Sequence, residues 1–202
     1  MSGTTLISRT HPRYWNRELQ WRLQWKALAS IDLLVMDVDG VLTDGGLWLD
    51  AHGELQKRFD VRDGLGLRLL QQAGMILAFL SGGKGGATEA RAKQLGIQHC
   101  LVGIKDKAAA LAELQQQLNL SQLNTAFVGD DLIDLIVRPL GKLLLAPADA
   151  CRPLRSQADA VLQRRGGHGA VRELAERLLK ARGQWHQLRN KGWKDRLSLI
   201  HI

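Results

Sequence analysis

Residues 31–45 read Ile-Asp-Leu-Leu-Val-Met-Asp-Val-Asp-Gly-Val-Leu-Thr-Asp-Gly, and the rest of the chain is arranged around this stretch. Four apolar residues in a row, 33–36, predict a buried parallel strand. Asp37 and Asp39 follow at its carboxyl end, where open α/β sheets bind ligands, and a side-chain period of two points both to one face. Two carboxylates repel each other, so we expect a cation such as Mg²⁺ between them. Taken alone, the stretch also fits a strand end followed by an ordinary Asp-Gly turn.

Strand and helix patterns alternate along most of the chain. Further strands are expected at 75–80, 98–101, 124–128, 142–146 and 158–162, and helices at 65–73, from the glycine-rich segment 81–86 to about 95, at 107–118 and at 169–181. Such alternation is typical of a parallel sheet with helices on both faces. Right-handed crossovers would bring the carboxyl ends of the strands at 33–36, 75–80 and 124–128 to one edge. The expected fold class is α/β, a Rossmann-like parallel sheet sandwiched by helices.

Two segments depart from this alternation. Residues 46–60 predict a β-hairpin around a glycine-containing turn, and Asp63 is the expected N-cap of the helix that follows. Residues 14–29 predict an amphipathic helix whose apolar stripe is Leu19, Leu23 and Ala27, extended by Leu28 and packed on the domain or on a partner chain. The expected organisation is an N-terminal basic helix at 1–30, a main domain at 31–182 and a basic tail at 183–202.

Composition excludes several classes of protein. With 202 residues, 45% of them apolar, we expect one globular domain with a sizeable core, no membrane-spanning segment and no signal peptide. The net charge of +8 lies in the ends, because residues 31–163 carry 13 basic and 16 acidic side chains. No nucleic-acid-binding motif accompanies this charge, so solvated ends, or ends docked on an acidic subunit, are favoured. Cys100 and Cys151 make no disulfide framework, which indicates reduced thiols in a cytoplasmic protein.

The expected sheet edge combines groups that suit a phosphate and a hard cation. Several carboxylates and no Cys/His cluster favour Mg²⁺ over Zn²⁺. A hydroxyl, the N–H groups of a glycine-rich loop before a helix, and a lysine at a helix start would bind an anion. The residues concerned are Asp37, Asp39, Ser81, Gly82, Lys107, Asp130 and Asp131.

In this order, the motifs resemble those of the haloacid dehalogenase-like phosphatases over residues 31–182. They are Asp37-x-Asp39-Gly-Val-Leu-Thr, Ser81-Gly, Lys107 and Gly129-Asp-Asp-x-x-Asp134. Three longer stretches, 37–45, Phe-Asp-Val-Arg-Asp-Gly at 59–64 and Gly-Gly-His-Gly-Ala-Val-Arg-Glu at 166–173, are similar to the 3-deoxy-D-manno-octulosonate 8-phosphate (KDO 8-phosphate) phosphatases. The resemblance implies an Mg²⁺-dependent phosphomonoester hydrolase acting on a phosphorylated sugar acid.

The resemblance also implies a role for each site residue. Asp37 would attack phosphorus, and Asp39 would protonate the leaving alkoxide and then activate water. Mg²⁺ would be held by Asp37, the backbone carbonyl of Asp39, and Asp130. The remaining assignments are Asp131 and Asp134 for orienting these ligands and Lys107, and Ser81, Gly82 and Lys107 for holding the phosphoryl oxygens.

The segments between these motifs are too short for a cap domain. Only a hairpin, a tail or another subunit could then enclose a substrate, and the related phosphatases are similar in being uncapped tetramers. We therefore expect a homotetramer whose neighbouring subunits complete the sites.

The chain departs from the resemblance where substrate would be recognised. Gly83 stands where such phosphatases usually have arginine, Lys84 follows it, and His168 replaces an arginine in the C-terminal glycine motif. Arg62, Lys84 and His168 are the candidate substrate contacts. Two alternatives stay open: a nine-carbon sugar acid (KDN or N-acylneuraminate) 9-phosphate phosphatase, and a non-catalytic assembly module related to domains fused to cytidylyltransferases.

The last six residues, Leu-Ser-Leu-Ile-His-Ile at 197–202, can be encoded by CTG TCT CTT ATA CAC ATC. That sequence matches a widely used transposon sequencing adapter. We hypothesise that these residues are read-through from library preparation and exclude them from reasoning about the fold.

Overall fold

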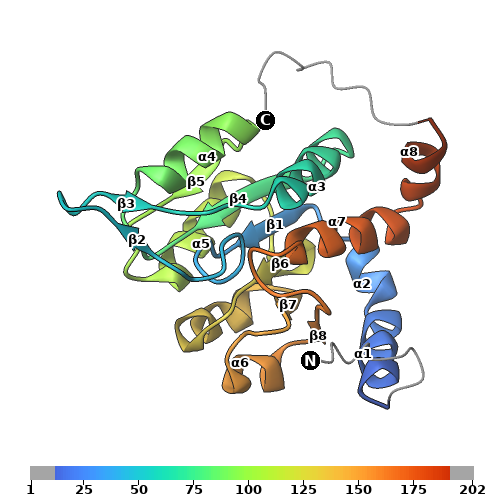
Figure 1. Ribbon diagram of the computed structural model, residues 1–202. Coiled ribbons are helices and arrows are strands. Elements are labelled where there is room, and N and C mark those ends of the chain that lie inside the picture. The colour runs from blue at the N-terminus through green and yellow to red at the C-terminus, as the bar shows by residue number, and fades with distance from the viewer. Residues whose placement is uncertain (1–11, 192–202) are drawn as a thin grey trace, which may run out of the picture.

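The computed structural model describes residues 12–191 and contains one six-stranded parallel sheet in the order β5-β4-β1-β6-β7-β8 (Figure 1). This confirms the predicted α/β class and the parallel pairing. The strands are β1 (Leu33–Met36), β4 (Ile76–Leu80), β5 (His99–Leu101), β6 (Thr125–Val128), β7 (Leu143–Ala146) and β8 (Ala160–Val161). A separate hairpin pairs β2 (Trp48–Leu49) with β3 (Leu55–Gln56), as predicted for residues 46–60.

Helices cover both faces of the sheet. Alternate residues of the buried strands face opposite layers, so Leu34 and Met36 pack with α3 and α7, whereas Leu33 and Val35 pack with α5 and η2. The helical elements are α3 (Val61–Gln72), α4 (Ala87–Leu95), α5 (Lys107–Gln117), η1 (Gln122–Asn124), η2 (Leu132–Leu140), α6 (Arg152–Gln157), α7 (Ala170–Ala181) and α8 (Trp185–Lys191). Among the residues described, no helix is both long and apolar enough to cross a bilayer.

Strand register decides which residues share the functional edge. Met36, the last residue of β1, lies opposite Phe79 of β4 and Val128 of β6. The backbone N–H of Asp37 then donates to the Val128 carbonyl at 2.9 Å, which extends the ladder by one step. The segments that leave these three central strands therefore begin side by side, as the right-handed crossovers predict.

The N-terminal segment forms two short helices, α1 (Pro12–Leu23) and α2 (Trp25–Ala29), instead of one. The predicted apolar stripe is wrong at Leu19 and Leu23, which are exposed, and is confirmed at Leu28, which is buried, and at Ala27, which packs against the core. Trp21, outside the predicted stripe, is buried. The Trp21 indole N–H donates to the Val161 carbonyl at 3.1 Å, so α1 turns this buried side chain toward the edge strand β8.

The helix after the hairpin starts earlier than predicted, at Val61. Its N-cap is Asp60, whose side chain accepts from the Arg62 backbone N–H at 2.7 Å, so the assignment of this cap to Asp63 is wrong. Asp63 is buried, and its carboxylate accepts from the backbone N–H groups of Gly169 at 3.2 Å and Arg172 at 2.7 Å. It therefore caps α7, whose own N-cap residue, Gly169, has no side chain that could do so.

Burial raises the pKa of Asp63 to about 6, although the two backbone donors oppose this shift.

The predicted N-terminal extension, main domain and tail remain an interpretation of the sequence, and residues 197–202 lie outside the described residues. Both cysteines are free.

Candidate active site

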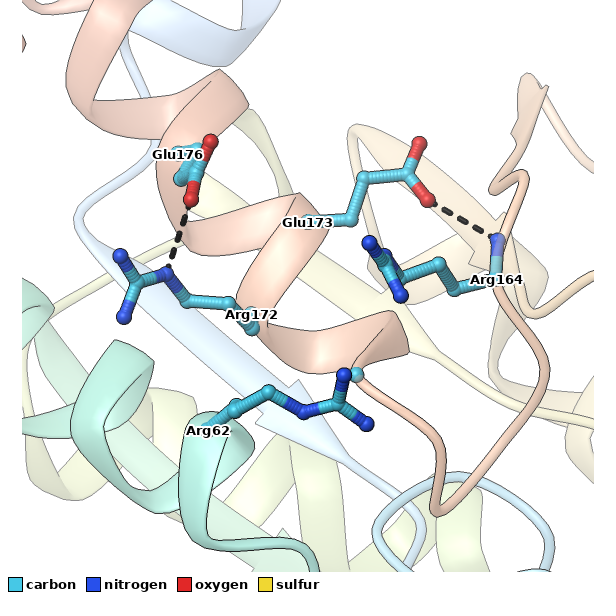
Figure 2. A pocket seen from close by; sticks show the side chains of 6 residues that line it. Arg62, Arg164, Arg172, Glu173 and Glu176 are labelled. Atoms are coloured by element: carbon cyan, nitrogen blue, oxygen red, sulfur yellow. Dashed lines mark hydrogen bonds and ion pairs between the residues drawn. The ribbon is translucent and has the colours of Figure 1, made fainter.

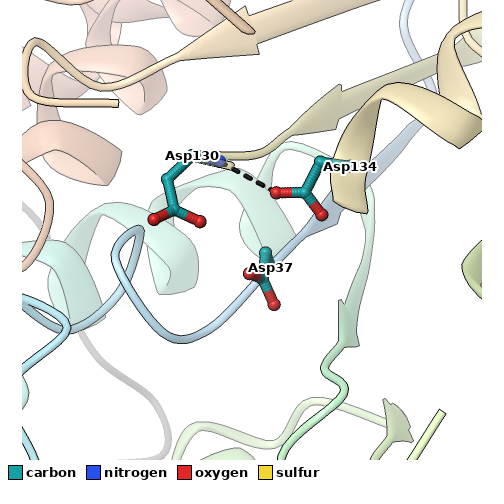
Figure 3. Close-up of side chains that lie close together, drawn as sticks. All are labelled: Asp37, Asp130 and Asp134. Atoms are coloured by element: carbon teal, nitrogen blue, oxygen red, sulfur yellow. Dashed lines mark hydrogen bonds between the residues drawn. The ribbon is translucent and has the colours of Figure 1, made fainter. Parts of the chain in front are cut away.

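Three carboxylates meet at the carboxyl edge of the sheet. Asp37 follows β1, Asp130 follows β6, and Asp134 lies in η2; each offers an oxygen within 4.8 Å of the others (Figure 3). Gly129 permits this approach, since a Cβ at that position would lie 2.5 Å from the Cβ of Asp134. Gly40 has a φ of +84°, and a Cβ there would collide with the Asp130 carboxylate. Two glycines thus make room for a dense acidic cluster.

Lys107 joins the cluster from the first position of α5. Its ammonium lies 2.7 Å from Asp134 Oδ1 and 3.1 Å from Asp37 Oδ1, and its side chain is 4% exposed. Burial by itself would lower the pKa of Lys107. The two neighbouring carboxylates outweigh this effect, so the pKa of Lys107 is raised. Asp134 also accepts from the Asp130 backbone N–H at 2.9 Å, so it fixes both the lysine and the loop after β6.

The cluster holds more negative charge than Lys107 can offset. Burial raises the pKa of Asp37, and the facing charge of Asp134 adds to this. Burial also raises the pKa of Asp130, with Asp37 and Asp134 contributing further. A divalent cation would offset both effects, and carboxylate oxygens are the ligands that Mg²⁺ prefers. The donor set at this edge therefore fits Mg²⁺.

Asp39 lies beside this cluster with different partners. The Lys57 ammonium lies 2.8 Å from its Oδ1 and 2.9 Å from its Oδ2, and the Ser81 hydroxyl donates to Oδ2 at 3.4 Å. Lys57 also donates to the hydroxyl of the buried Thr88 at 3.2 Å. Sequence reasoning missed Lys57, which follows directly after β3. A lone lysine at the end of a predicted strand carries no signal of its own.

The other predicted residues lie as follows. Ser81 is buried and accepts from the Gly83 backbone N–H at 3.1 Å, while Gly82 is exposed at the start of the glycine-rich loop. Asp131 is exposed and caps η2 by accepting from the Leu132 backbone N–H at 2.7 Å. It therefore shapes the loop after β6, whereas the contact with Lys107 comes from Asp134.

The three candidate substrate residues are exposed and lie on different segments of the chain. Arg62 forms an ion pair with Asp60 at 2.6 Å and lines a pocket of about 340 Å³ at the start of α7 (Figure 2). Lys84 and His168 are both exposed, on the glycine-rich loop and on the loop before α7. The structure brings neither of these two side chains into contact with the acidic cluster.

Comparisons with known proteins identify the family. No family model matches the chain. The 3-deoxy-D-manno-octulosonate 8-phosphate phosphatase of Escherichia coli K12 is 42% identical over 155 residues, 77% of this chain and 82% of the relative. The phosphatase of the same name from Haemophilus influenzae is 40% identical over 157 residues, 78% of this chain and 87% of the relative.

Solved structures agree with these relatives. The 3-deoxy-D-manno-octulosonate 8-phosphate phosphatase of Moraxella catarrhalis, in complex with magnesium ion, phosphate ion and KDO, matches with a TM-score of 0.82 and 35% identity over 85% of this chain and 99% of that one. A putative haloacid dehalogenase superfamily hydrolase from Legionella pneumophila matches with a TM-score of 0.82 and 36% identity over 87% of this chain and 97% of that one. This chain belongs to the 3-deoxy-D-manno-octulosonate 8-phosphate phosphatase family of haloacid dehalogenase-like hydrolases.

Proposed function

We propose that this chain hydrolyses KDO 8-phosphate to KDO and inorganic phosphate. Family membership supports the substrate, and the geometry at the sheet edge supports the chemistry. The observation that carries the proposal is the contact of Asp37 with the buried Lys107, beside Asp130 and Asp134. This arrangement combines a nucleophilic carboxylate with a fixed positive charge for the phosphoryl oxygens.

Two carboxylates divide the proton and electron-pair work of the reaction. A carboxylate oxygen of Asp37 attacks phosphorus, the bond from phosphorus to the sugar oxygen breaks, and Asp39 gives its proton to that leaving oxygen. Water then attacks the phosphorus of the aspartyl-phosphate, and Asp39 takes the proton from the water. The carboxylate of Asp37 is regenerated and phosphate leaves. Catalysis of this kind consists mainly of positioning and charge neutralisation.

The proposed metal is Mg²⁺, held by the carboxylates of Asp37 and Asp130 and by the backbone carbonyl of Asp39. When bound, it neutralises the charge that gathers on the phosphoryl oxygens. The raised pKa values of Asp37 and Asp130 and the oxygen-only donor set support this assignment. Asp134 orients Lys107, and Asp131 shapes the loop that carries Asp130.

The phosphoryl group is held, in this proposal, by the Ser81 hydroxyl, the Gly82 backbone N–H and Lys107. The sugar acid is contacted by Arg62, Lys84 and His168. Exposure of the last two side chains leaves them free to reach a bound sugar.

The decisive experiment compares catalytic efficiency on a panel of sugar acid phosphates. We expect KDO 8-phosphate to exceed the nine-carbon 9-phosphates, and we expect Asp37→Asn or chelation of Mg²⁺ to abolish hydrolysis. Gly83 is the reason to include the nine-carbon esters, because it removes the side chain that would normally face the sugar. Preference for a nine-carbon ester would overturn the substrate, and a wild-type chain inactive on the whole panel would indicate the assembly module instead.

We also propose a homotetramer located in the cytoplasm, in which neighbouring subunits enclose each site. The apolar side chains at the hairpin support the assembly, since Leu47, Trp48 and Leu49 are 57%, 67% and 67% exposed. Light scattering should report four chains. A fully active monomer would contradict the assembly.

A further inference from the structure

We propose that Lys57 is a positioning residue that holds the carboxylate of Asp39 in its working orientation; this inference rests on the proposed phosphatase function. The Lys57 ammonium contacts both oxygens of Asp39, at 2.8 and 2.9 Å. The side chain of Asp39 is 32% exposed, whereas that of Lys57 is 1% exposed. The lysine therefore approaches Asp39 from inside the protein and leaves one side of the carboxylate open to substrate.

Burying an ammonium costs free energy unless its donors are satisfied. Lys57 donates hydrogen bonds to Asp39 Oδ2 and to the hydroxyl of Thr88, and its ammonium forms an ion pair with Asp39 Oδ1 at 2.8 Å, although that oxygen accepts no hydrogen bond from the residues described. Thr88 is itself fully buried in the first turn of α4. The ammonium is thus fixed between α4 and the loop after β1. Lys57 is therefore a buried lysine with specific partners and not a solvated surface lysine.

The backbone on either side of Lys57 is also fixed. The preceding residues form β3 of the hairpin, and three residues later Asp60 caps α3. Between them, the Arg58 guanidinium donates to the Gly167 carbonyl at 3.1 Å. The lysine side chain therefore starts from an anchored position, so its reach to Asp39 is set by the fold.

Gly83 makes room for this contact. A Cβ at position 83 would lie 3.1 Å from Asp39 Oδ2 and 3.5 Å from the Lys57 ammonium. Gly83, which stands where related phosphatases usually have arginine, therefore lies next to Lys57 in space. The positive charge beside Asp39 comes from the hairpin and not from the glycine-rich loop.

The contact has a specific consequence for the reaction. Rotation about the last bond of an aspartate side chain is broad, so a free carboxylate samples many orientations. Lys57 restricts that rotation, and the leaving oxygen receives its proton only when the protonated carboxyl group of Asp39 faces it. Esters with a poor leaving group, such as a sugar alkoxide, depend on that proton. Esters with a good leaving group, such as p-nitrophenolate, do not.

The test measures release of the leaving group in a single turnover with Mg²⁺-loaded enzyme in excess, so that hydrolysis of the aspartyl-phosphate does not contribute. Lys57→Met is compared with wild type on KDO 8-phosphate and on p-nitrophenyl phosphate. We expect a loss of roughly 10- to 100-fold on the sugar ester, a part of what positioned acid–base catalysis supplies, and less than about 3-fold on the aryl ester. Lys93→Met, which removes an exposed lysine from α4, should change neither rate.

Equal losses on the two esters, or no loss on the sugar ester, would overturn the role of Lys57 while leaving the phosphatase function intact. Wild-type chain that transfers phosphate from neither ester would overturn the proposed function, and the role of Lys57 would fall with it. Circular dichroism verifies that the variant is folded. If Lys57→Met does not fold, Lys57→Gln replaces it. We then expect a smaller loss of rate on the sugar ester, which still exceeds the loss on the aryl ester.

Discussion

Replacing Asp130 by asparagine should stabilise the metal-free chain while abolishing its phosphatase activity. Asp130 offers an oxygen within 4.8 Å of both Asp37 and Asp134, and its side chain has no hydrogen-bond donor in the described structure. Burial and these two neighbours raise the pKa of Asp130 to about 8, so at pH 7.5 the metal-free folded chain must either protonate this carboxylate or bear a repulsion of about 3.5 kcal/mol between two unit charges at an effective dielectric constant of 20. Attraction to Lys107 offsets part of this repulsion. We expect Asp130→Asn to raise the free energy of unfolding by about 2 kcal/mol without metal.

Mg²⁺ should reverse this ranking. A ligand at 100 times its dissociation constant stabilises the folded state by about 2.7 kcal/mol, and Asp130→Asn removes one of the carboxylates proposed to bind it. Wild type should therefore gain stability on addition of Mg²⁺, whereas the variant should gain little. Urea denaturation at pH 7.5, in chelator and in excess Mg²⁺, measures both differences.

The control for this prediction is Glu113→Gln, which neutralises an exposed carboxylate on α5. This change should alter neither the metal-free stability nor the response to Mg²⁺. An Asp130→Asn chain that is less stable than wild type in chelator would refute the repulsion argument. A variant that keeps the full Mg²⁺ response would refute the assignment of Asp130 as a ligand.

Three further changes test other parts of the structure. Trp21→Ala should lower the free energy of unfolding by about 3 kcal/mol in urea, because it removes a buried indole and its bond to the Val161 carbonyl. Gly40→Ala should abolish turnover, since its Cβ would displace the Asp130 carboxylate, and a fully active variant would contradict the site geometry. Asp63→Asn should destabilise the chain by about 2 kcal/mol because the amide cannot accept both backbone bonds. The pKa of Asp63 in the folded chain is raised to about 6, above its ordinary value of 3.8. The stability that Asp63 contributes is therefore complete below pH 3.8 and declines as the pH rises through 6. The difference in the free energy of unfolding between wild type and Asp63→Asn, measured in urea, should narrow from pH 4 to 8.

Elements with a strong local pattern were predicted well, and elements that depend on distant contacts were not. The four apolar residues of β1 and the alternation after them were enough for a parallel sheet, because such a strand must be covered on both faces. The predicted buried face of the N-terminal helix was wrong at Leu19 and Leu23, because periodicity cannot show which of two apolar faces packs against the domain. The prediction that Asp63 caps α3 was wrong because residue type does not show at which position the helix begins. The helix begins after Asp60, and the position of α7 makes Asp63 the cap of that helix instead.

The sequence by itself determined that Asp37, Asp39, Ser81 and Asp130 would share one edge, because each directly follows, or lies within three residues of, a strand of one parallel sheet. Only the tertiary structure decided which charges pair across that edge. Lys57 reaches Asp39 across 18 residues, and Asp63 caps a helix whose N-cap residue, Gly169, lies 106 residues later. Local sequence fixes where a strand ends, whereas the partner of a buried charge depends on which distant segment packs closely enough to satisfy it.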